Sequence, residues 1–74
     1  MDGRRRRSVE LIIDDAADAA LIRFASDEVA GSRLQACNPD CPELGGDITI
    51  DIDQEGRLVS IELRGIRRIL PTGW

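Results

Sequence analysis

The feature that most constrains this chain is an unbroken alternation of isoleucine with polar residues over residues 47–53. A period of two places alternate side chains on opposite faces of a β-strand. A second alternating run follows at residues 58–63, and Gln54-Glu55-Gly56 between them predicts a turn with Gly56 in the left-handed conformation. We therefore predict a β-hairpin with an apolar inner face. The inward residues are Ile48, Ile50 and Ile52 on the first strand and Val59, Ile61 and Leu63 on the second.

The amino-terminal part of the chain predicts two more strands. Residues 9–13 are aliphatic and β-branched, with alternate residues on one face. Residues 14–18 interrupt this pattern with acids and predict a turn. Alanine-rich residues 15–24 leave a short helix as the local alternative, but the alternation over residues 20–24 favours a second strand.

The rest of the chain adds one weak strand and one helical turn. We expect a turn at residues 26–27, a strand over residues 28–36 and a long loop over residues 37–46, which is rich in Asn, Pro and Gly. Ile66, Ile69 and Leu70 have helical spacing before Pro71. The predicted fold class is mainly β, a small antiparallel β-meander of four to five short strands with a short C-terminal helical turn.

The length of the chain limits its core and favours self-association. With 74 residues and 8.1 kDa, folding buries only about 60% of the unfolded surface. We predict a disordered arginine-rich tail at residues 1–8, a single small β domain at 9–70 and a C-terminal tail at 71–74. Because so small a core is marginal, we expect a homo-oligomer, with a dimer favoured.

The residue types that are missing exclude most enzyme chemistry. The sequence has no His, no Tyr and no Lys, so the commonest general base, the Schiff-base amine and the imidazole metal ligand are all absent. We therefore predict a protein that is not an enzyme, with no catalytic residues and no cofactor. No apolar run approaches the roughly 20 residues of a membrane span, so we expect a cytoplasmic protein without a membrane partner.

Charge is distributed unevenly along the chain. The net charge is -4, yet Arg4, Arg5, Arg6 and Arg7 are consecutive, while the segment after them is strongly acidic. Nucleic-acid binding needs a basic groove or stripe, which this acidic body does not offer. The four arginines are the candidates for a nucleic-acid arm, but a solvated tail is the expected interpretation.

The two cysteines, Cys37 and Cys41, lie close together in the predicted loop, separated by Asn38-Pro39-Asp40. Two thiols supply half of a structural zinc site, and only a dimer would bring four thiolates together. The two residues could instead form a disulfide or remain free thiols in a reducing compartment. Free thiols are favoured, because a cytoplasmic protein is expected.

Residues 51–62 fit much of a calcium-loop template, with acids at the first, third and fifth positions, Gly at the sixth and Glu at the twelfth. The template also needs a helix on each side, whereas the flanking residues alternate with a period of two, so the hairpin is favoured. A weaker form of this idea is that a hard cation binds outer-face carboxylates, with Asp51, Asp53 and Asp18 as the candidates. No dedicated metal site is predicted.

Two blocks of sequence resemble a known family. They are Asp14-x-x-Ala17-Asp18-x-x-x-Ile22 and Ile50-x-Ile52-Asp53-x-x-Gly56-Arg57-Leu58-Val59-x-Ile61-Glu62. Together they are similar to the small bacterial domain of unknown function twenty-two eighty-three, over about residues 9–63. The resemblance implies an antiparallel β-sheet without known catalytic residues, and the toxin-like gene neighbours of some members imply a partner-binding or antitoxin-like role for the chain.

Five residues match the signature of that family: Asp14, Asp18, Asp53, Gly56 and Arg57. Three of them also have a structural use. Asp18 suits a turn backbone, Gly56 a left-handed position, and Arg57 a cross-strand pairing with Asp53.

We predict from these observations a non-enzymatic β domain that self-associates or binds another protein through a sheet face or an exposed edge. Its support is the thin core and the apolar residues on second faces, Ile12, Leu21 and Leu58. The alternatives are a weak divalent-cation binder and a nucleic-acid accessory that uses residues 4–7.

Overall fold

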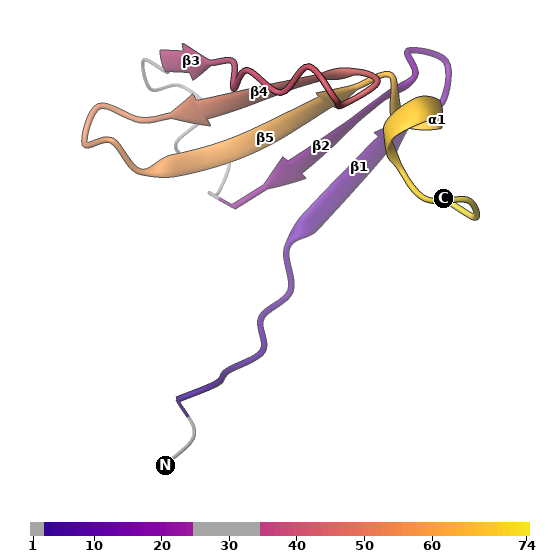
Figure 1. Ribbon diagram of the computed structural model, residues 1–74. Helices are drawn as coiled ribbons and strands as arrows, with labels where there is room; N and C mark the ends of the chain where they lie inside the picture. The colour runs from indigo at the N-terminus through magenta and orange to yellow at the C-terminus, as the bar shows by residue number, and fades with distance from the viewer. Residues whose placement is uncertain (1–2, 25–34) are drawn as a thin grey trace.

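The computed structural model describes residues 3–24 and 35–74 and shows one sheet with a short helix at its end (Figure 1). The strands are β1 (Glu10–Asp14), β2 (Ala19–Arg23), β3 (Gln35–Cys37), β4 (Asp47–Ile52) and β5 (Leu58–Arg64), and the helix is α1 (Ile66–Ile69). The mainly β class, the antiparallel pairing and the C-terminal helical turn are all confirmed. Before β1 the chain runs away from the sheet as an extended segment (Figure 1).

The order of the strands in the sheet is β1-β2-β5-β4-β3. In a simple meander each strand lies beside the next one in sequence, whereas here β5 lies between β2 and β4. All four pairings are antiparallel. This order gives β5, the longest strand, a hydrogen-bonded neighbour on each side.

The first two strands confirm the strands predicted near residues 9–13 and 20–24, and they exclude the alternative of a short helix. β1 pairs with β2 through the turn over residues 15–18, so residues 15–24 do not form a helix. The expected turn at 26–27 and most of the expected strand at 28–36 lie outside the described residues. Within the described part, β3 begins at Gln35 and includes Cys37, which the sequence pattern places in the loop.

The β4–β5 hairpin has the predicted turn. Asp53 organises it: its backbone carbonyl accepts a hydrogen bond from the Gly56 N–H at 3.1 Å, and its backbone N–H donates to Arg57 O at 2.9 Å. Gly56 has φ 77, the left-handed conformation predicted for it. The ladder is irregular between Asp51 and Ile52, so Ile52 lies opposite Leu58.

The helical turn α1 is attached to the β1–β2 turn by Asp18. The Asp18 carbonyl accepts hydrogen bonds from the backbone N–H groups of Gly65 at 2.8 Å and Ile66 at 3.2 Å. Leu70 is extended, with φ -90 and ψ 149, so the helix ends before Pro71. Ile66, the first residue of α1, is buried.

The core is small. Ala20, Val59 and Ile66 are its buried hydrophobic residues within the described part of the chain, and no described side chain is completely removed from solvent. Ser60 is the buried polar residue, and its hydroxyl donates to Asp51 Oδ2 at 2.9 Å. The sheet is therefore a single layer that buries few side chains.

Candidate functional site

One face of the sheet carries two apolar rows that cross the strands. Directly paired residues form the first row, which reads Leu11, Ile22, Ile61, Ile50 and Cys37 across all five strands. The second row reads Ile13, Ala20, Leu63 and Ile48 across four strands. Side chains directly opposite on paired strands lie on the same face, so we call these two rows the apolar face.

The other face is mainly polar. Its rows contain Glu62 beside Thr49, and Ser60 beside Asp51. It also carries some apolar residues: Ile12 lies opposite Leu21, Ala19 opposite Asp14, and Ala36 opposite Asp51. Glu10 and Arg23 lie opposite each other at its edge and form an ion pair of 3.3 Å. This polar face is suited to solvent.

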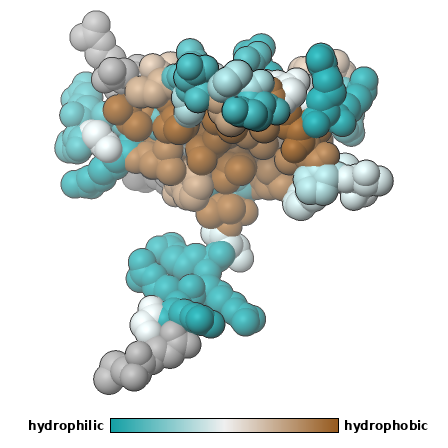
Figure 2. All heavy atoms as spheres, in the orientation of Figure 1, coloured by the Kyte–Doolittle hydropathy of each residue, from teal (hydrophilic) through white to brown (hydrophobic). Residues whose placement is uncertain are grey.

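The apolar face remains accessible in the described structure. Ile22, Ile48, Ile50, Ile61 and Leu63 are only half-buried, and in β1 both Leu11 and Ile13 are exposed. Figure 2 shows apolar side chains gathered over the strands on the side toward the viewer. The four-residue helix α1 is too short to form a second layer. The apolar face is therefore the candidate functional site.

The three candidate cation ligands do not come together. Asp51 accepts the Ser60 hydroxyl on the polar face. Asp53 lies in the hairpin turn, where its carboxylate accepts the N–H groups of Glu55 at 3.0 Å and Arg57 at 2.8 Å. Asp18 lies at the opposite end of the strands, beside the Arg64 end of β5. In the part of the chain that is described, no group of three or more Cys, Asp or Glu side chains is placed to hold a metal.

Residues 51–62 form the hairpin, so its prediction is confirmed and the calcium-loop alternative is wrong. The physical reason is that Asp51 and Ile52 are in β4 and hydrogen-bond to a neighbouring strand. A calcium loop instead wraps its ligand oxygens around an ion.

The signature residues are placed at turns. Asp14 Oδ1 accepts the Ala17 N–H at 3.1 Å. Asp18 has a left-handed backbone with φ 53, and its Oδ1 accepts the Arg67 N–H at 3.0 Å. The contact that joins Arg57 to Asp53 comes from the Arg57 backbone rather than from its guanidinium.

The candidate nucleic-acid residues Arg4, Arg5, Arg6 and Arg7 are exposed and lie in the extended segment before β1. The segment that carries them runs away from the sheet (Figure 1). The described residues contain no helix long and apolar enough to cross a membrane.

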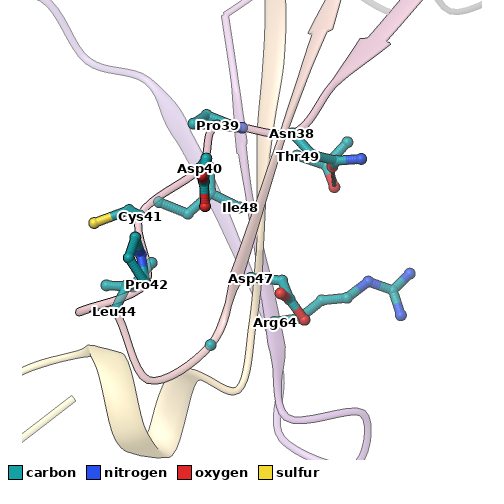
Figure 3. A pocket seen from close by; sticks show the side chains of 11 residues that line it. Asn38, Pro39, Asp40, Cys41, Pro42, Leu44, Asp47, Ile48, Thr49 and Arg64 are labelled. Carbon is teal, nitrogen blue, oxygen red and sulfur yellow. Dashed lines mark hydrogen bonds between the residues drawn. The ribbon is translucent and has the colours of Figure 1, made fainter.

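A cavity of about 540 Å³ lies between the 38–47 loop and the start of β4 (Figure 3). At one end the Thr49 hydroxyl donates to Asn38 Oδ1 at 2.8 Å. Cys41 points away from β4 and donates weakly to Glu43 Oε2 at 3.7 Å, and both cysteines are free and exposed. The Arg64 guanidinium pairs with Glu62 at 2.8 Å.

The full extent of the apolar face does not follow from the local sequence pattern. The alternation placed Ile48, Ile50 and Ile61 on the inner side of the hairpin, but it did not show that Leu11 and Cys37 belong to the same row. The missing information is the pairing of β2 with β5, which joins residues about forty positions apart. No local pattern in the sequence encodes that pairing.

Comparison with known proteins places the chain in a family. Residues 11–66 match the model of the family described as "Protein of unknown function (DUF2283)", and the chain belongs to this family. The match runs from the second residue of β1 to the first residue of α1. No curated protein and no solved structure matches the chain.

Proposed function

We propose that this member of the DUF2283 family is a non-enzymatic protein-interaction module, and that a second copy of the chain covers its apolar face. The observation that carries the proposal is the continuous row of Leu11, Ile22, Ile61, Ile50 and Cys37 across the sheet. A sheet with one apolar face is stable when that face packs on another layer. The described residues contain no such layer.

The size of the face fits a dimer. Neighbouring strands are about 4.8 Å apart, and each residue adds about 3.3 Å to the length of a strand, so five strands present a face of roughly 24 by 20 Å. The chain exposes 6258 Å², whereas a compact protein of its mass would expose roughly 4,500 Å². The extended amino-terminal segment accounts for part of this excess. Two such outlines, one on each copy, come to roughly 1,000 Å², which is at the low end of the range for specific protein interfaces.

The chemistry of the face favours packing of sheet on sheet. Two identical faces placed about 10 Å apart, related by a two-fold axis, form a β-sandwich whose core is built of interdigitating aliphatic side chains. Both polar faces then remain in water. In an antitoxin-like role, a different protein would cover the same face, and the solution mass distinguishes that outcome from a second copy.

Catalysis is not part of the proposal, because the side chains present do not support it. The chain has no His, Tyr or Lys. Among the described carboxylates, those of Asp14 and Asp53 accept hydrogen bonds from backbone N–H groups at turns, and that of Asp51 accepts the Ser60 hydroxyl on the polar face. These contacts give the carboxylates structural uses.

The test is the solution mass of the full chain, measured by analytical ultracentrifugation from low to high micromolar concentration. We expect twice the chain mass or more at the upper end. Ile61→Lys places a charge at the centre of the apolar face and is expected to weaken this association at least tenfold. Thr49→Lys adds the same charge on the polar face and should leave it unchanged.

Circular dichroism of both variants keeps the test interpretable, because a β spectrum for Ile61→Lys shows that the sheet still forms. A strictly monomeric wild-type chain at every concentration would contradict the proposal. If the wild type is monomeric but a heterologous protein protects the face, the second copy is the wrong occupant.

A further inference from the structure

Exposed apolar side chains are concentrated at one edge of the sheet. Of the seven large hydrophobic residues that are exposed in the described structure, four fall within residues 9–13: Val9, Leu11, Ile12 and Ile13. Residues 10–14 are β1, and every one of them is exposed. Because β1 is an edge strand with β2 as its only neighbour, one row of its backbone N–H and C=O groups faces outward.

The two edges of the sheet differ in their protection. The opposite edge, β3, has three residues and is followed closely by Pro39, so it offers a short and interrupted ladder. β1 has five residues and no Pro, and its ladder has no irregularity. The extended segment at residues 3–9 continues it beyond the sheet (Figure 1). β1 is thus the edge that can accept another strand.

Charge identifies the strand that fits there. The segment before β1 carries Arg4, Arg5, Arg6 and Arg7, while the last residue of β1 is Asp14 and the turn after it carries Asp15 and Asp18. β1 is therefore basic before its start and acidic after its end. An antiparallel copy of the same strand reverses this order and brings each basic segment to the other copy's acidic turn.

We propose that β1 pairs with β1 of a second copy, antiparallel and in a register centred on Leu11. In this register Leu11 lies opposite Leu11, Val9 opposite Ile13 and Ser8 opposite Asp14, so the apolar residues stay on one face. Arg7 then reaches the turn at Asp15 of the second copy. Opposite charges at these positions favour the pairing and fix its register.

Neighbouring registers are less favourable. A two-fold axis perpendicular to the sheet keeps the apolar faces of both copies on the same side. With that axis centred on Ile12, Glu10 would lie opposite Asp14 twice, and with it centred on Glu10, the two Glu10 side chains would face each other. Like charges directly opposite destabilise a strand pair, so Leu11 is the centre that avoids this cost.

This edge contact goes beyond the proposed function, because it uses backbone hydrogen bonds at β1 rather than the apolar face. It doubles the sheet and extends the apolar face across both copies. The two contacts use different surfaces, so either contact can form without the other.

The test is a disulfide that only this register can form. In a Cys37→Ser, Cys41→Ser background of the full chain, Leu11→Cys supplies the only thiol. The two Cα atoms of residues directly opposite in an antiparallel pair are about 4.5 to 5.5 Å apart, within the range of a disulfide. Copies packed face to face lie about 10 Å apart, too far for one. We expect Leu11→Cys to form a covalent dimer on mild oxidation, seen on a non-reducing gel.

Ile13→Cys is the matched control, since Ile13 lies on the same strand and face with 38% exposure against 41% for Leu11. In the proposed register Ile13 of one copy lies opposite Val9 of the other. The two Ile13 residues are therefore about 13 Å apart along the strand direction. It should cross-link at least tenfold more slowly than Leu11→Cys. A mixture of Val9→Cys and Ile13→Cys chains should give the mixed dimer.

Equal cross-linking at positions 11 and 13, or no cross-linking at position 11, would overturn the proposal. Faster cross-linking of Ile12→Cys than of Leu11→Cys would overturn the register.

Repeating the oxidation with Ile61→Lys separates this inference from the proposed function, because the edge disulfide should still form when the apolar face is disrupted. Changing Arg5, Arg6 and Arg7 to Glu should slow the Leu11→Cys reaction at least threefold, and adding Asp15→Arg should restore part of the rate.

Discussion

The centre of the sheet and its first strand are built from similar residues but have different environments. β5 pairs along both of its edges and contains the buried residues Val59 and Ser60. β1 is equally rich in aliphatic residues, yet all of its residues are exposed. The difference shows that β-forming composition determines where a strand forms, whereas its neighbours in the sheet determine what it buries.

The two environments imply different uses for the two strands. Side chains in β5 stabilise the fold within one copy, while those of β1 are available for contact with another. Substitutions in β5 are therefore expected to act on folding, and substitutions in and before β1 on association. Matched substitutions in the two regions test this separation.

The largest difference in stability is expected when valine is changed to aspartate at a buried and at an exposed position. Val59 is 7% exposed in β5 and Val9 is 51% exposed before β1. Val59→Asp leaves an unpaired charge in the core and should lower the free energy of unfolding by about 3 to 5 kcal/mol, enough to unfold so small a domain. Val9→Asp should change it by less than about 0.5 kcal/mol. Chemical denaturation of both variants at one low protein concentration measures this, and equal losses would abolish the distinction between the two strands.

A smaller loss of folding stability is expected from a substitution where the 38–46 loop meets the end of β5. A Cβ added at Gly46 would collide with the Arg64 carbonyl oxygen, so the loop must move to accommodate Gly46→Ala. We expect a loss of up to about 3 kcal/mol in thermal or chemical unfolding. Gly45→Ala is the control, because its Cβ would lie at an ordinary 3.4 Å from Arg68 Cβ. Similar stabilities for the two variants would show that this junction does not constrain β5.

Asp18 connects the two regions, because the β1–β2 turn reaches α1 through it. Asp18→Ala removes the acceptor for the Arg67 N–H and places alanine at φ 53. Together these changes should cost about 2 kcal/mol. Asp18→Asn keeps an oxygen acceptor and tolerates the left-handed backbone, so it should lose less than half as much. Hydrogen exchange at the α1 amides reports the loss locally, and unchanged protection in Asp18→Ala would refute the role of this contact.

The smallest loss of folding stability is expected from a substitution in the β4–β5 hairpin turn. Gly56 has φ 77, so Gly56→Ala should cost about 1 kcal/mol from backbone strain alone. No atom lies within 4 Å of the added Cβ, which excludes a steric contribution. Gly3→Ala in the extended segment also has open space and should be neutral. A thermal melt of each variant checks this pair, and a neutral Gly56→Ala would mean that the turn carries no strain.

Much of the fold could be predicted from the sequence, because its signals are local. The alternation over residues 47–53, the turn at Gly56 and the helical spacing of Ile66, Ile69 and Leu70 each depend on neighbours along the chain. The predicted strands near residues 9–13 and 20–24 formed for the same reason. Alanine-rich residues 16–20 did not become a helix, because the pairing of β2 with two strands outweighs a weak local preference.

The candidate site was less predictable, because it depends on which strands become neighbours. An apolar face was expected for the hairpin, but its extension to Leu11 and Cys37 follows from the β2–β5 and β3–β4 pairings. Asp18 was expected to satisfy its own turn, whereas it also binds α1, which lies far along the chain. Pairings of this kind reflect the whole sheet and leave no pattern at single residues.

The most direct test of the account is the solvent accessibility of isoleucine methyl groups, measured by NMR with a soluble paramagnetic probe over a range of protein concentrations. As concentration rises, the methyl groups of Ile22, Ile50 and Ile61 on the apolar face should become protected, while Ile12 on the polar face stays accessible. Methyl groups on both faces that remain equally accessible at the highest concentration would contradict the claim that a second copy covers the apolar face.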